Sequence, residues 1–414
     1  MPNAKTLLII GKVWPEPRSS AAGSRMIQLI QLFKKDGWEI TFSSSAAKSD
    51  YSFDLEKIGV HEEPVQLNES SFDDFVLDIN PQAVLFDRYM TEEQFGWRVA
   101  ENCPDALRIL DTEDLHCLRN ARQNAWRESK KFEIEDLFTE ETAKREIASI
   151  LRCDLSLIIS DVEVQILKEA FHINESLIFY LPFLLDTEKE TEPEKLLSFE
   201  DRNAFVSIGN FRHEPNWNAV LWLKDELWPL IREKLPSAKL YLYGSYPTKK
   251  TFQLSNPDDG FLIKGRASDA KEVIGKARVL LAPLRFGAGL KGKLVDAMQC
   301  GTPSVTTSIG AEGIVLGSKW NGVIADKSRQ FADAAVELYQ NFDFWQTSQK
   351  AGFELLKKRF SRNKFAPAIL AYIEEVSENL EQHREKNFTG SMLMHHTMNS
   401  TKFMSKWIEE KNKT

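Results

Sequence analysis

Glycines and cations gather between residues 279 and 313, in the stretch VLLAPLRFGAGLKGKLVDAMQCGTPSVTTSIGAEG. Gly287, Ala288 and Gly289 follow an apolar run typical of a buried strand, and a helix is expected to begin near Leu290. The N-terminus of a helix carries unpaired N–H groups and the positive end of a dipole, which suit a phosphate. Cations there are disfavoured by about 0.3–1 kcal/mol each unless an anion is present. The flanking cations therefore predict a diphosphate site, and they are Arg285, Lys291 and Lys293.

Two other interpretations of this stretch stay open. Lys293 and Asp296 could form an ordinary surface ion pair three residues apart, worth about 0.2–0.5 kcal/mol. The glycines also match the GxGxxG pattern of a dinucleotide site, with Glu312 about twenty residues further on. That pattern places its first glycine directly after the strand, whereas the segment PLRF intervenes here. An NAD site is therefore the weaker interpretation.

The composition is that of an ordinary globular chain of 414 residues, with 42% hydrophobic and 28% charged residues. This length predicts two or three domains. The net charge of −8 argues against nucleic-acid binding, so any basic site must be local. The cysteines lack the CxxC spacing and neighbouring histidines of a zinc site, and we find neither a signal peptide nor a long apolar run. A cytoplasmic protein without disulfides or structural zinc is expected.

Two segments of the first domain carry candidate residues for an acceptor site. Ser20 and Gly23 lie in a small-residue loop after a strand expected at residues 6–10, where open α/β sheets bind ligands. A later strand, expected at residues 107–110, leads into a polar segment with Asp114, His116 and Arg119. Residues 123–150 follow, and their many charges predict a solvated helical excursion.

The sequence predicts two tandem α/β halves joined by a charged linker. Such halves form Rossmann-like domains that face a cleft, and ligands bind in that cleft. Methionines near the C-terminus could indicate a lipid or partner contact, but a frayed or surface-packed terminus is the simpler interpretation. The expected divisions are 1–185 for the N-terminal domain, 186–203 for the linker, 204–362 for the C-terminal domain, 363–382 for a final amphipathic helix and 383–414 for a polar tail.

The second half resembles the retaining glycosyltransferases of the large group 1 family, which have the two-Rossmann GT-B fold. The first half matches more loosely, through residues 15–23 and 111–122, and the resemblance covers roughly residues 5–380. It implies transfer of a sugar from a nucleotide-diphosphate sugar with retention of configuration. The C-terminal domain would bind the donor, and the last helix would cross back to the acceptor domain. The matching pieces of the second half are Gly209-Asn210-Phe211-Arg212, Pro215-Asn216, Gly244, Gly265-Arg266 and the glycine-rich stretch.

The resemblance assigns roles to individual residues. It implies that Arg212 and Lys291 contact the donor phosphates and that His116 lies beside the transferred sugar. Asp296 matches the second acid of the family's acidic pair and is expected to bind the ribose, whereas the first acid falls on Ala288. Backbone N–H groups of the glycine loop are expected to replace that missing side chain. Further expected donor-side residues are Gly209, Gly265, Arg266, Arg285, Gly287, Gly289, Leu290 and Glu312, and expected acceptor-side residues are Ser20, Gly23, Asp114 and Arg119.

The predicted function is a hexosyltransferase-type reaction in glycan biosynthesis, with a glycan, a lipid-linked saccharide or a small molecule as acceptor. The leaving phosphate can take the acceptor proton on the same face of the sugar, so no protein nucleophile is needed. No DxD motif is recognisable, so no metal and no cofactor besides the donor are expected. A lipid acceptor would imply peripheral membrane contact, although no basic amphipathic helix indicates it. Two alternatives remain, a nucleotide-sugar epimerase and a non-catalytic nucleotide-sugar-binding protein, the latter motivated by Ala288.

Overall fold

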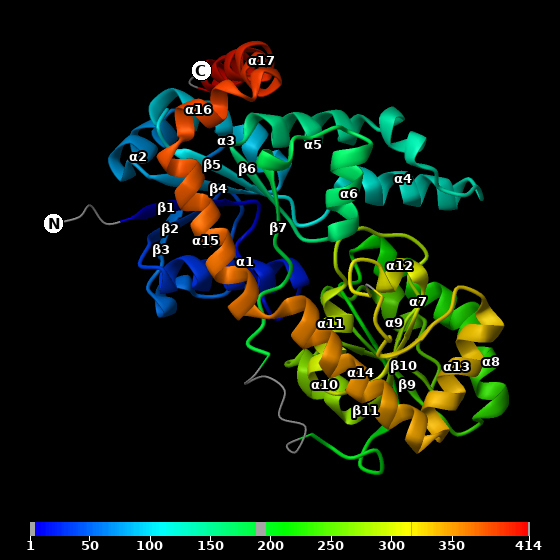
Figure 1. Ribbon diagram of the computed structural model, residues 1–414. Helices are drawn as coiled ribbons and strands as arrows, with labels where there is room; N and C mark the ends of the chain where they lie inside the picture. The colour runs from blue at the N-terminus through cyan, green and yellow to red at the C-terminus, as the bar shows by residue number, and fades with distance from the viewer. Residues whose placement is uncertain (1–4, 188–195, 316, 413–414) are drawn as a thin grey trace.

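The computed structural model describes residues 5–187, 196–315 and 317–412, which form two α/β domains (Figure 1). Within each of the two sheets, neighbouring strands pair in parallel. Parallel strands are buried on both faces, and this explains their nearly continuous apolar sequences. The predicted α/β class with two Rossmann-like domains is confirmed.

The N-terminal sheet has seven strands in the order β3-β2-β1-β4-β5-β6-β7. The order reverses between β1 and β4, which are hydrogen-bonded neighbours. Such a reversal opens a crevice at the carboxyl ends of the strands. The strands are β1 (Thr6–Gly11), β2 (Glu39–Ser44), β3 (His61–Pro64), β4 (Ala83–Asp87), β5 (Leu107–Asp111), β6 (Leu155–Ile158) and β7 (Ile178–Tyr180).

The C-terminal sheet has six strands in the order β10-β9-β8-β11-β12-β13, and its order reverses between β8 and β11. The carboxyl ends of both sheets therefore offer a crevice, as in doubly wound domains that bind ligands. The strands are β8 (Asn203–Ile208), β9 (Leu240–Tyr243), β10 (Phe261–Gly265), β11 (Ala277–Ala282), β12 (Ser304–Thr306) and β13 (Gly322–Ile324).

Helices cover both faces of each sheet, so each domain has two apolar layers. Along β1, Leu7 and Ile9 enter one layer and Leu8 and Ile10 enter the other, because side chains alternate along a strand. The helices of the N-terminal domain are α1 (Ala21–Lys35), α2 (Ser71–Ile79), α3 (Tyr89–Asn102), α4 (His116–Arg127), α5 (Glu141–Arg152) and α6 (Asp161–Glu169). Those of the C-terminal domain are α7 (Glu214–Trp222), α8 (Trp228–Lys234), α9 (Lys249–Gln253), α10 (Ala270–Lys276), α11 (Gly292–Gln299), α12 (Ser308–Ala311), α13 (Ser328–Gln340) and α14 (Phe342–Phe360).

The last helices return to the N-terminal domain, as the orange and red ribbon of Figure 1 shows. Helix α15 (Arg362–Glu378) buries Phe365, Ile369 and Ile373 in the apolar layer that also holds α1. The predicted polar tail is helical in its described part, where it forms α16 (Leu380–Glu385) and α17 (Phe388–Asn412).

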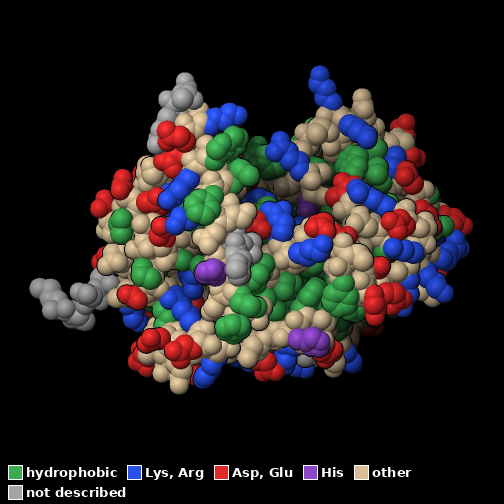
Figure 2. Space-filling view, turned by 90° about the horizontal axis from the view of Figure 1, so that it is seen from above, with side chains coloured by type: hydrophobic (Ala, Val, Ile, Leu, Met, Phe, Trp, Pro, Cys, Tyr) green, Lys and Arg blue, Asp and Glu red, His purple; other side chains and the backbone are tan. Residues whose placement is uncertain are grey.

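Helix α17 lies against α3 and α5. The buried guanidinium of Arg98 on α3 donates to Ser405 Oγ at 3.4 Å and forms an ion pair with Glu409 at 3.7 Å. Viewed from above, this side of the molecule shows acidic and basic side chains interspersed, with hydrophobic side chains between them (Figure 2). The terminus is therefore a surface-packed helix.

One prediction about a connecting segment needs correction. Residues 123–150 were expected to be a solvated excursion, but α5 packs Ala143 and Ile150 into the core of the N-terminal domain. The high charge of α5 hid this, because its apolar residues occupy only one face. Of the predicted linker, only residues 186–187 and 196–203 lie within the described residues. Arg202 in this segment is buried and donates to Thr302 Oγ1 at 2.6 Å.

Candidate active site

A cavity of about 480 Å³ lies at the carboxyl ends of both sheets and is lined by residues from both domains. The N-terminal wall includes Lys12, Arg18, Ser20, Arg88, Glu113, Asp114, His116 and Arg119. The C-terminal wall includes Gly209, Asn210, His213, Asn216, Ser245, Arg266, Asp296 and the glycine loop from Gly287 to Lys293. The structure thus brings the predicted acceptor and donor segments to one cavity.

Most residues predicted for the site line this cavity. From the acceptor side these are Ser20, Asp114, His116 and Arg119, and from the donor side Gly209, Arg266, Gly287, Ala288, Gly289, Leu290, Lys291 and Asp296. Five predicted residues do not line it, namely Gly23, Arg212, Gly265, Arg285 and Glu312.

Arg285 was predicted to bind phosphate, but it contacts aromatic rings instead. Its guanidinium lies 4.7 Å from the ring of Trp126 and 5.0 Å from that of Trp222, and its Nε donates to Asn218 Oδ1 at 2.7 Å. Arg212 is likewise held over Tyr246, 4.2 Å from the ring centre. Both cations are attracted to the negative face of an aromatic ring, so neither points into the cavity.

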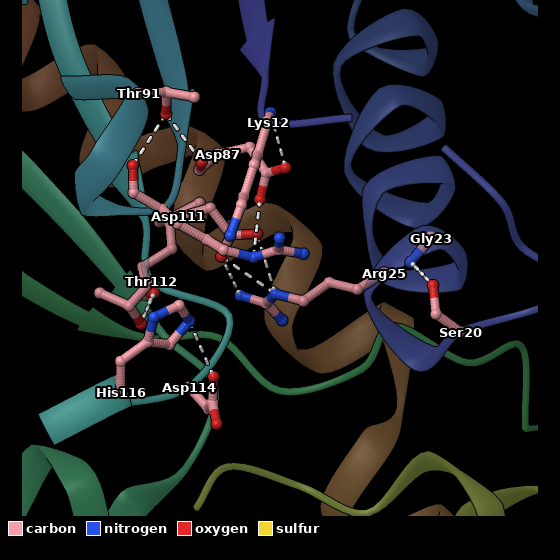
Figure 3. A network of polar contacts seen from close by, with 12 residues as sticks. Lys12, Ser20, Gly23, Arg25, Asp87, Thr91, Asp111, Thr112, Asp114 and His116 are labelled. Atoms are coloured by element: carbon pink, nitrogen blue, oxygen red, sulfur yellow. Dashed lines mark hydrogen bonds and ion pairs between the residues drawn. The ribbon is translucent and has the colours of Figure 1, made fainter. Parts of the chain in front are cut away.

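Two predicted glycines are explained by local packing. A Cβ atom on Gly23 would lie 2.5 Å from the backbone oxygen of Glu16, so helix α1 can approach that loop only through a glycine. The N–H of Gly23 donates to Ser20 Oγ at 3.0 Å, and this caps α1 (Figure 3). Gly265 ends β10, just before the cavity-lining Arg266.

The glycine loop lies directly against the N-terminal domain. Gly289 has a φ of +61°, and a Cβ atom there would lie 2.7 Å from Cβ of Asp114. The helix that follows begins at Gly292 rather than near Leu290, with Lys291 as its N-cap residue. Lys291 Nζ donates back to the carbonyl of Gly289 at 2.9 Å, which holds the loop in a tight turn.

Two lysines follow the loop and are largely surrounded by protein. Burial lowers the pKa of Lys291 to about 8 and that of Lys293 to about 8. Lys293 Nζ donates to Asn216 Oδ1 at 2.8 Å. Glu312, Glu163 and Asp114 partly offset the effect of burial on Lys291, whereas burial is the cause of the lowered pKa of Lys293. A desolvated cation favours an anionic ligand.

His116 is the first residue of α4 and has its backbone fixed by a distant carboxylate. Glu146 on α5 accepts hydrogen bonds from the N–H groups of His116 and Cys117, each at 2.7 Å. These groups have no partner within a helix, and the helix dipole favours a carboxylate there. Burial raises the pKa of Glu146 to about 7. Sequence reasoning missed Glu146, because it lies thirty residues away in the segment expected to be solvated.

The imidazole of His116 is neutral at physiological pH, since burial lowers its pKa to about 3. Its Nε2 lies 3.4 Å from Asp114 Oδ1, and its ring packs edge-on against Tyr89 at 5.4 Å (Figure 3). Arg119 forms an ion pair with the same Asp114 carboxylate. Burial would raise the pKa of Asp114, but Arg119 and His116 hold it below its ordinary range.

Glu163, fully buried on α6, connects the two walls. Its Oε1 accepts from the N–H of Gly289 in the donor loop at 2.8 Å and from that of Leu115 at 3.0 Å. Arg122 on α4 makes a second connection, because it donates to the carbonyl of Gly287 at 2.8 Å and binds the Glu312 carboxylate at 2.7 Å. Glu312 therefore joins the C-terminal domain to the N-terminal domain through Arg122.

A buried ion pair stands behind the N-terminal wall. Arg25 on α1 donates to both oxygens of Asp111 at the end of β5, at 2.8–3.2 Å, and to the carbonyl of Leu181 at 2.7 Å (Figure 3). Both side chains are almost completely buried, so this pair fixes the loop that leads to His116. Sequence reasoning missed Arg25, because its partner Asp111 lies 86 residues away in the chain.

Sequence reasoning also gave Lys12 and Arg88 no role in the site, although their positions in the chain indicate one. Lys12 follows β1 and Arg88 follows β4, and the carboxyl ends of parallel strands meet at one edge of a sheet. Glu113 follows β5 in the same way. Taking every polar residue within three positions after a predicted strand would have found all three.

Comparisons with known proteins agree with this architecture. Residues 202–341 match the model of the family described as Glycosyl transferases group 1. The chain is 24% identical over 185 residues to an uncharacterized 44.6 kDa protein in the cps region of Klebsiella pneumoniae, covering 43% of this chain and 48% of that protein. The match thus spans about half the length of this relative.

Solved structures of glycosyltransferases share the fold over most of the chain. Anabaena HepE, in complex with UDP and glucose, superposes with a TM-score of 0.67 at 13% identity, covering 90% of this chain and 100% of that one. Sucrose-phosphate synthase of Thermosynechococcus elongatus gives 0.65 at 13% identity, covering 90% and 99%. The fold is therefore GT-B, and the resemblance to the group 1 glycosyltransferases is confirmed.

None of the helices in residues 5–187, 196–315 and 317–412 has the length and apolar sequence that crossing a bilayer requires. The same residues contain no group of three or more His, Cys, Asp or Glu side chains placed to hold a metal ion.

Proposed function

We propose that the chain transfers a sugar from a nucleotide-diphosphate sugar to an acceptor bound between the two domains, with retention of anomeric configuration. The observation that carries this proposal is the C-terminal wall of the cavity, where a glycine loop, two desolvated lysines and the N-terminus of α11 converge. This wall lies within residues 202–341, the part that matches the group 1 family. His116 faces it from the other domain.

The diphosphate would lie against Lys291, Lys293 and the N-terminus of α11. Loss of the nucleoside diphosphate leaves negative charge on its terminal phosphate, and preorganised cations in a poorly solvated cavity stabilise that charge strongly. Asp296, four residues into α11, would accept hydrogen bonds from the ribose. Arg212 would reach the phosphates only after leaving the ring of Tyr246.

The acceptor hydroxyl would attack on the face from which the phosphate departs. The departing phosphate oxygen would take the hydroxyl proton, so retention needs no carboxylate nucleophile from the chain. His116 is neutral, so it would orient the sugar through a hydrogen bond rather than act as a general acid. Ala288 lines the cavity without a functional group, so backbone N–H groups of the glycine loop would bind the sugar hydroxyls.

UDP is the first nucleotide to test as part of the donor, because Anabaena HepE is solved in complex with UDP and glucose. A glycan or lipid-linked acceptor would agree with the cps-region relative, and we propose that the reaction belongs to glycan biosynthesis on the cytoplasmic side. The donor would be the only co-substrate, and no metal would be required.

The test is thermal unfolding of the full chain with UDP, GDP, ADP and NAD, each with and without Mg²⁺. A nucleotide at about 100 times its Kd stabilises a protein by roughly 2.7 kcal/mol. The expected result is a shift with one nucleoside diphosphate that does not depend on Mg²⁺, and that is abolished by Lys291→Met. A shift with NAD alone would reject the proposal.

Product analysis with the stabilising nucleotide sugar separates the alternatives. A transferase releases the nucleoside diphosphate in proportion to the acceptor glycosylated. An epimerase changes the sugar without any acceptor, and a non-catalytic protein binds the nucleotide sugar without turnover.

A further inference from the structure

Two cations lie at the reversal point of the N-terminal sheet, the position where open α/β sheets bind ligands. Strands β1 and β4 pair there in register, with Ile10 opposite Phe86. Lys12 and Arg88 follow directly at the carboxyl ends of these strands, and both line the cavity. Neither belongs to the donor wall, which is built by the other domain.

The ammonium of Lys12 has no hydrogen-bond or ion-pair partner in the described part of the chain, although its backbone N–H donates to Asp87 Oδ2 at 3.1 Å. Partial burial and the nearby Arg88 lower the pKa of Lys12, whereas Asp87 and Asp114 raise it, and the residue stays exposed, so a ligand can reach it. Figure 3 shows this side chain extending from the end of β1, past Asp87, toward Asp111 and the side where His116 lies.

Arg88 keeps a backbone conformation that side chains disfavour. Its φ of +72° and ψ of 159° fall in a region populated almost only by glycine, so the backbone is strained there. The N–H of Arg88 donates to the carbonyl of Asp111 at 2.8 Å, which fixes this conformation. Its only ion pair in the described residues is with the preceding Asp87, at 3.4 Å. An arginine at a position suited to glycine indicates that the guanidinium itself is needed.

The charge of the whole cavity agrees with this interpretation. Cationic side chains outnumber carboxylates among the lining residues, although the chain carries a net charge of −8. Lys291 and Lys293 are balanced by a donor diphosphate under the proposed function. On the opposite wall, Arg119 is paired with Asp114 and Arg88 with Asp87, whereas Lys12 Nζ has no such partner within the described residues, and the donor diphosphate lies against the other domain.

We propose that Lys12 and Arg88 form an anion subsite on the acceptor side of the cavity, and that the acceptor carries a phosphate or a carboxylate group which they bind. That the bound anion belongs to an acceptor rests on the proposed function, whereas the anion subsite itself rests on the geometry of the N-terminal domain. The planar guanidinium of Arg88 suits two-point binding of either group, and the Lys12 ammonium would add a third donor.

The test is titration of inorganic phosphate into the full chain, alone and with saturating UDP, followed by thermal unfolding and calorimetry. Lys12→Met removes the charge and keeps most of the stem, and Lys12→Arg restores the charge. Arg88→Gly removes the guanidinium and relieves the backbone strain. Lys35→Met is the matched control, since Lys35 is an exposed lysine at the opposite end of α1 from the cavity.

We expect wild type, Lys12→Arg and Lys35→Met to bind phosphate in the presence of UDP, and Lys12→Met and Arg88→Gly to bind it about tenfold more weakly or worse. Unchanged phosphate binding in Lys12→Met, or none in wild type, would overturn the proposal. Repeating the titration with acetate distinguishes the two kinds of acceptor group. If the chain binds phosphate but not acetate, the acceptor carries a phosphate. If it binds both anions, the acceptor group can also be a carboxylate. If phosphate binding depends on Lys12 but no nucleotide stabilises the chain, the subsite stands and the transferase function fails.

Discussion

The carboxyl group of Glu163 accepts a hydrogen bond from the backbone N–H of Gly289 at 2.8 Å, and this bond joins the two domains beside the cavity. The same oxygen accepts from Leu115, the residue before His116. The donor loop and the start of α4 are therefore positioned by one buried side chain. Glu163 does not line the cavity, so its role is to position these groups rather than to contact a substrate.

Replacing Glu163 should separate positioning from charge. Glu163→Ala leaves two buried N–H groups without an acceptor, at about 1–3 kcal/mol each, and should lower kcat/KM by at least about tenfold. Glu163→Gln keeps an acceptor oxygen and should retain more activity than Glu163→Ala. Steady-state kinetics, with amide hydrogen exchange of the glycine loop, provides the measurement. Equal losses in both variants would argue against positioning through these hydrogen bonds.

Arg122 and Glu312 form the second connection between the domains, and their contributions should not be additive. Arg122→Ala removes the guanidinium that holds the carbonyl of Gly287, so nucleotide binding should weaken by about tenfold. Glu312→Gln should have a smaller effect of the same kind. Because the two side chains act as one unit, the double variant should resemble Arg122→Ala alone. Strict additivity in a double-mutant cycle would show that the ion pair does not position the loop.

The sequence predicted those parts of the site that rest on local patterns. The glycine loop, the strand before it and the segment with Asp114 and His116 all lie within short stretches whose periodicity or motif is visible. Glu146 and Glu163 were not predicted, because each acts on backbone N–H groups of a segment far away in the chain. Such pairing depends on how helices pack, which no local pattern contains.

Arg285 lies next to the phosphate motif along the chain but does not line the cavity. Its distance along the chain from Gly287 is short, but the direction of its side chain depends on two tryptophans from different domains. Arg285→Ala should therefore leave nucleotide affinity within about twofold of wild type. It should lower the melting temperature, because a partly desolvated cation–π contact is worth about 0.5–2 kcal/mol. Calorimetric nucleotide titration and thermal unfolding test this. A large loss of affinity would return Arg285 to the phosphate site.

Glu146 should control the acid side of the pH profile. Burial raises the pKa of Glu146 to about 7, whereas His116 stays neutral down to about pH 3. Loss of activity below pH 7 should therefore come from protonation of Glu146, which weakens its hydrogen bond with the backbone N–H of His116. Glu146→Gln should flatten this part of the kcat/KM profile. Persistence of the same acid limb in Glu146→Gln would assign it to another group.

The same residue makes an independent prediction about stability. The pKa of Glu146 is raised in the folded state from an ordinary value of 4.5 to about 7, so the folded chain binds more protons between these values. Its contribution to the free energy of unfolding therefore falls as pH rises through this window. Glu146→Gln should reduce that fall, as measured by denaturant unfolding at pH 5 and pH 8. The control is Glu141→Gln, since Glu141 is an exposed residue on the same helix.

Lys291 and Lys293 should take up protons when a nucleoside diphosphate binds. Burial lowers the pKa of both to about 8 in the empty cavity, so near pH 8 a substantial fraction of each is neutral. A bound diphosphate favours the charged form and raises both pKa values again. Calorimetric titration of UDP at pH 8 in buffers of different ionisation enthalpy should therefore show net proton uptake, and the affinity should fall as pH rises above 8.

The uptake can be assigned by two variants. Lys291→Met and Lys293→Met should each reduce it, and the larger reduction identifies the lysine closer to the diphosphate. Lys239→Met provides the control, because Lys239 is an exposed lysine of the same domain that does not line the cavity. Binding without proton uptake in wild type would mean that both lysines are already charged, or that the diphosphate lies elsewhere. If the binding enthalpy of Lys291→Met and Lys293→Met depends on the ionisation enthalpy of the buffer as in wild type, neither lysine is the origin of the proton uptake.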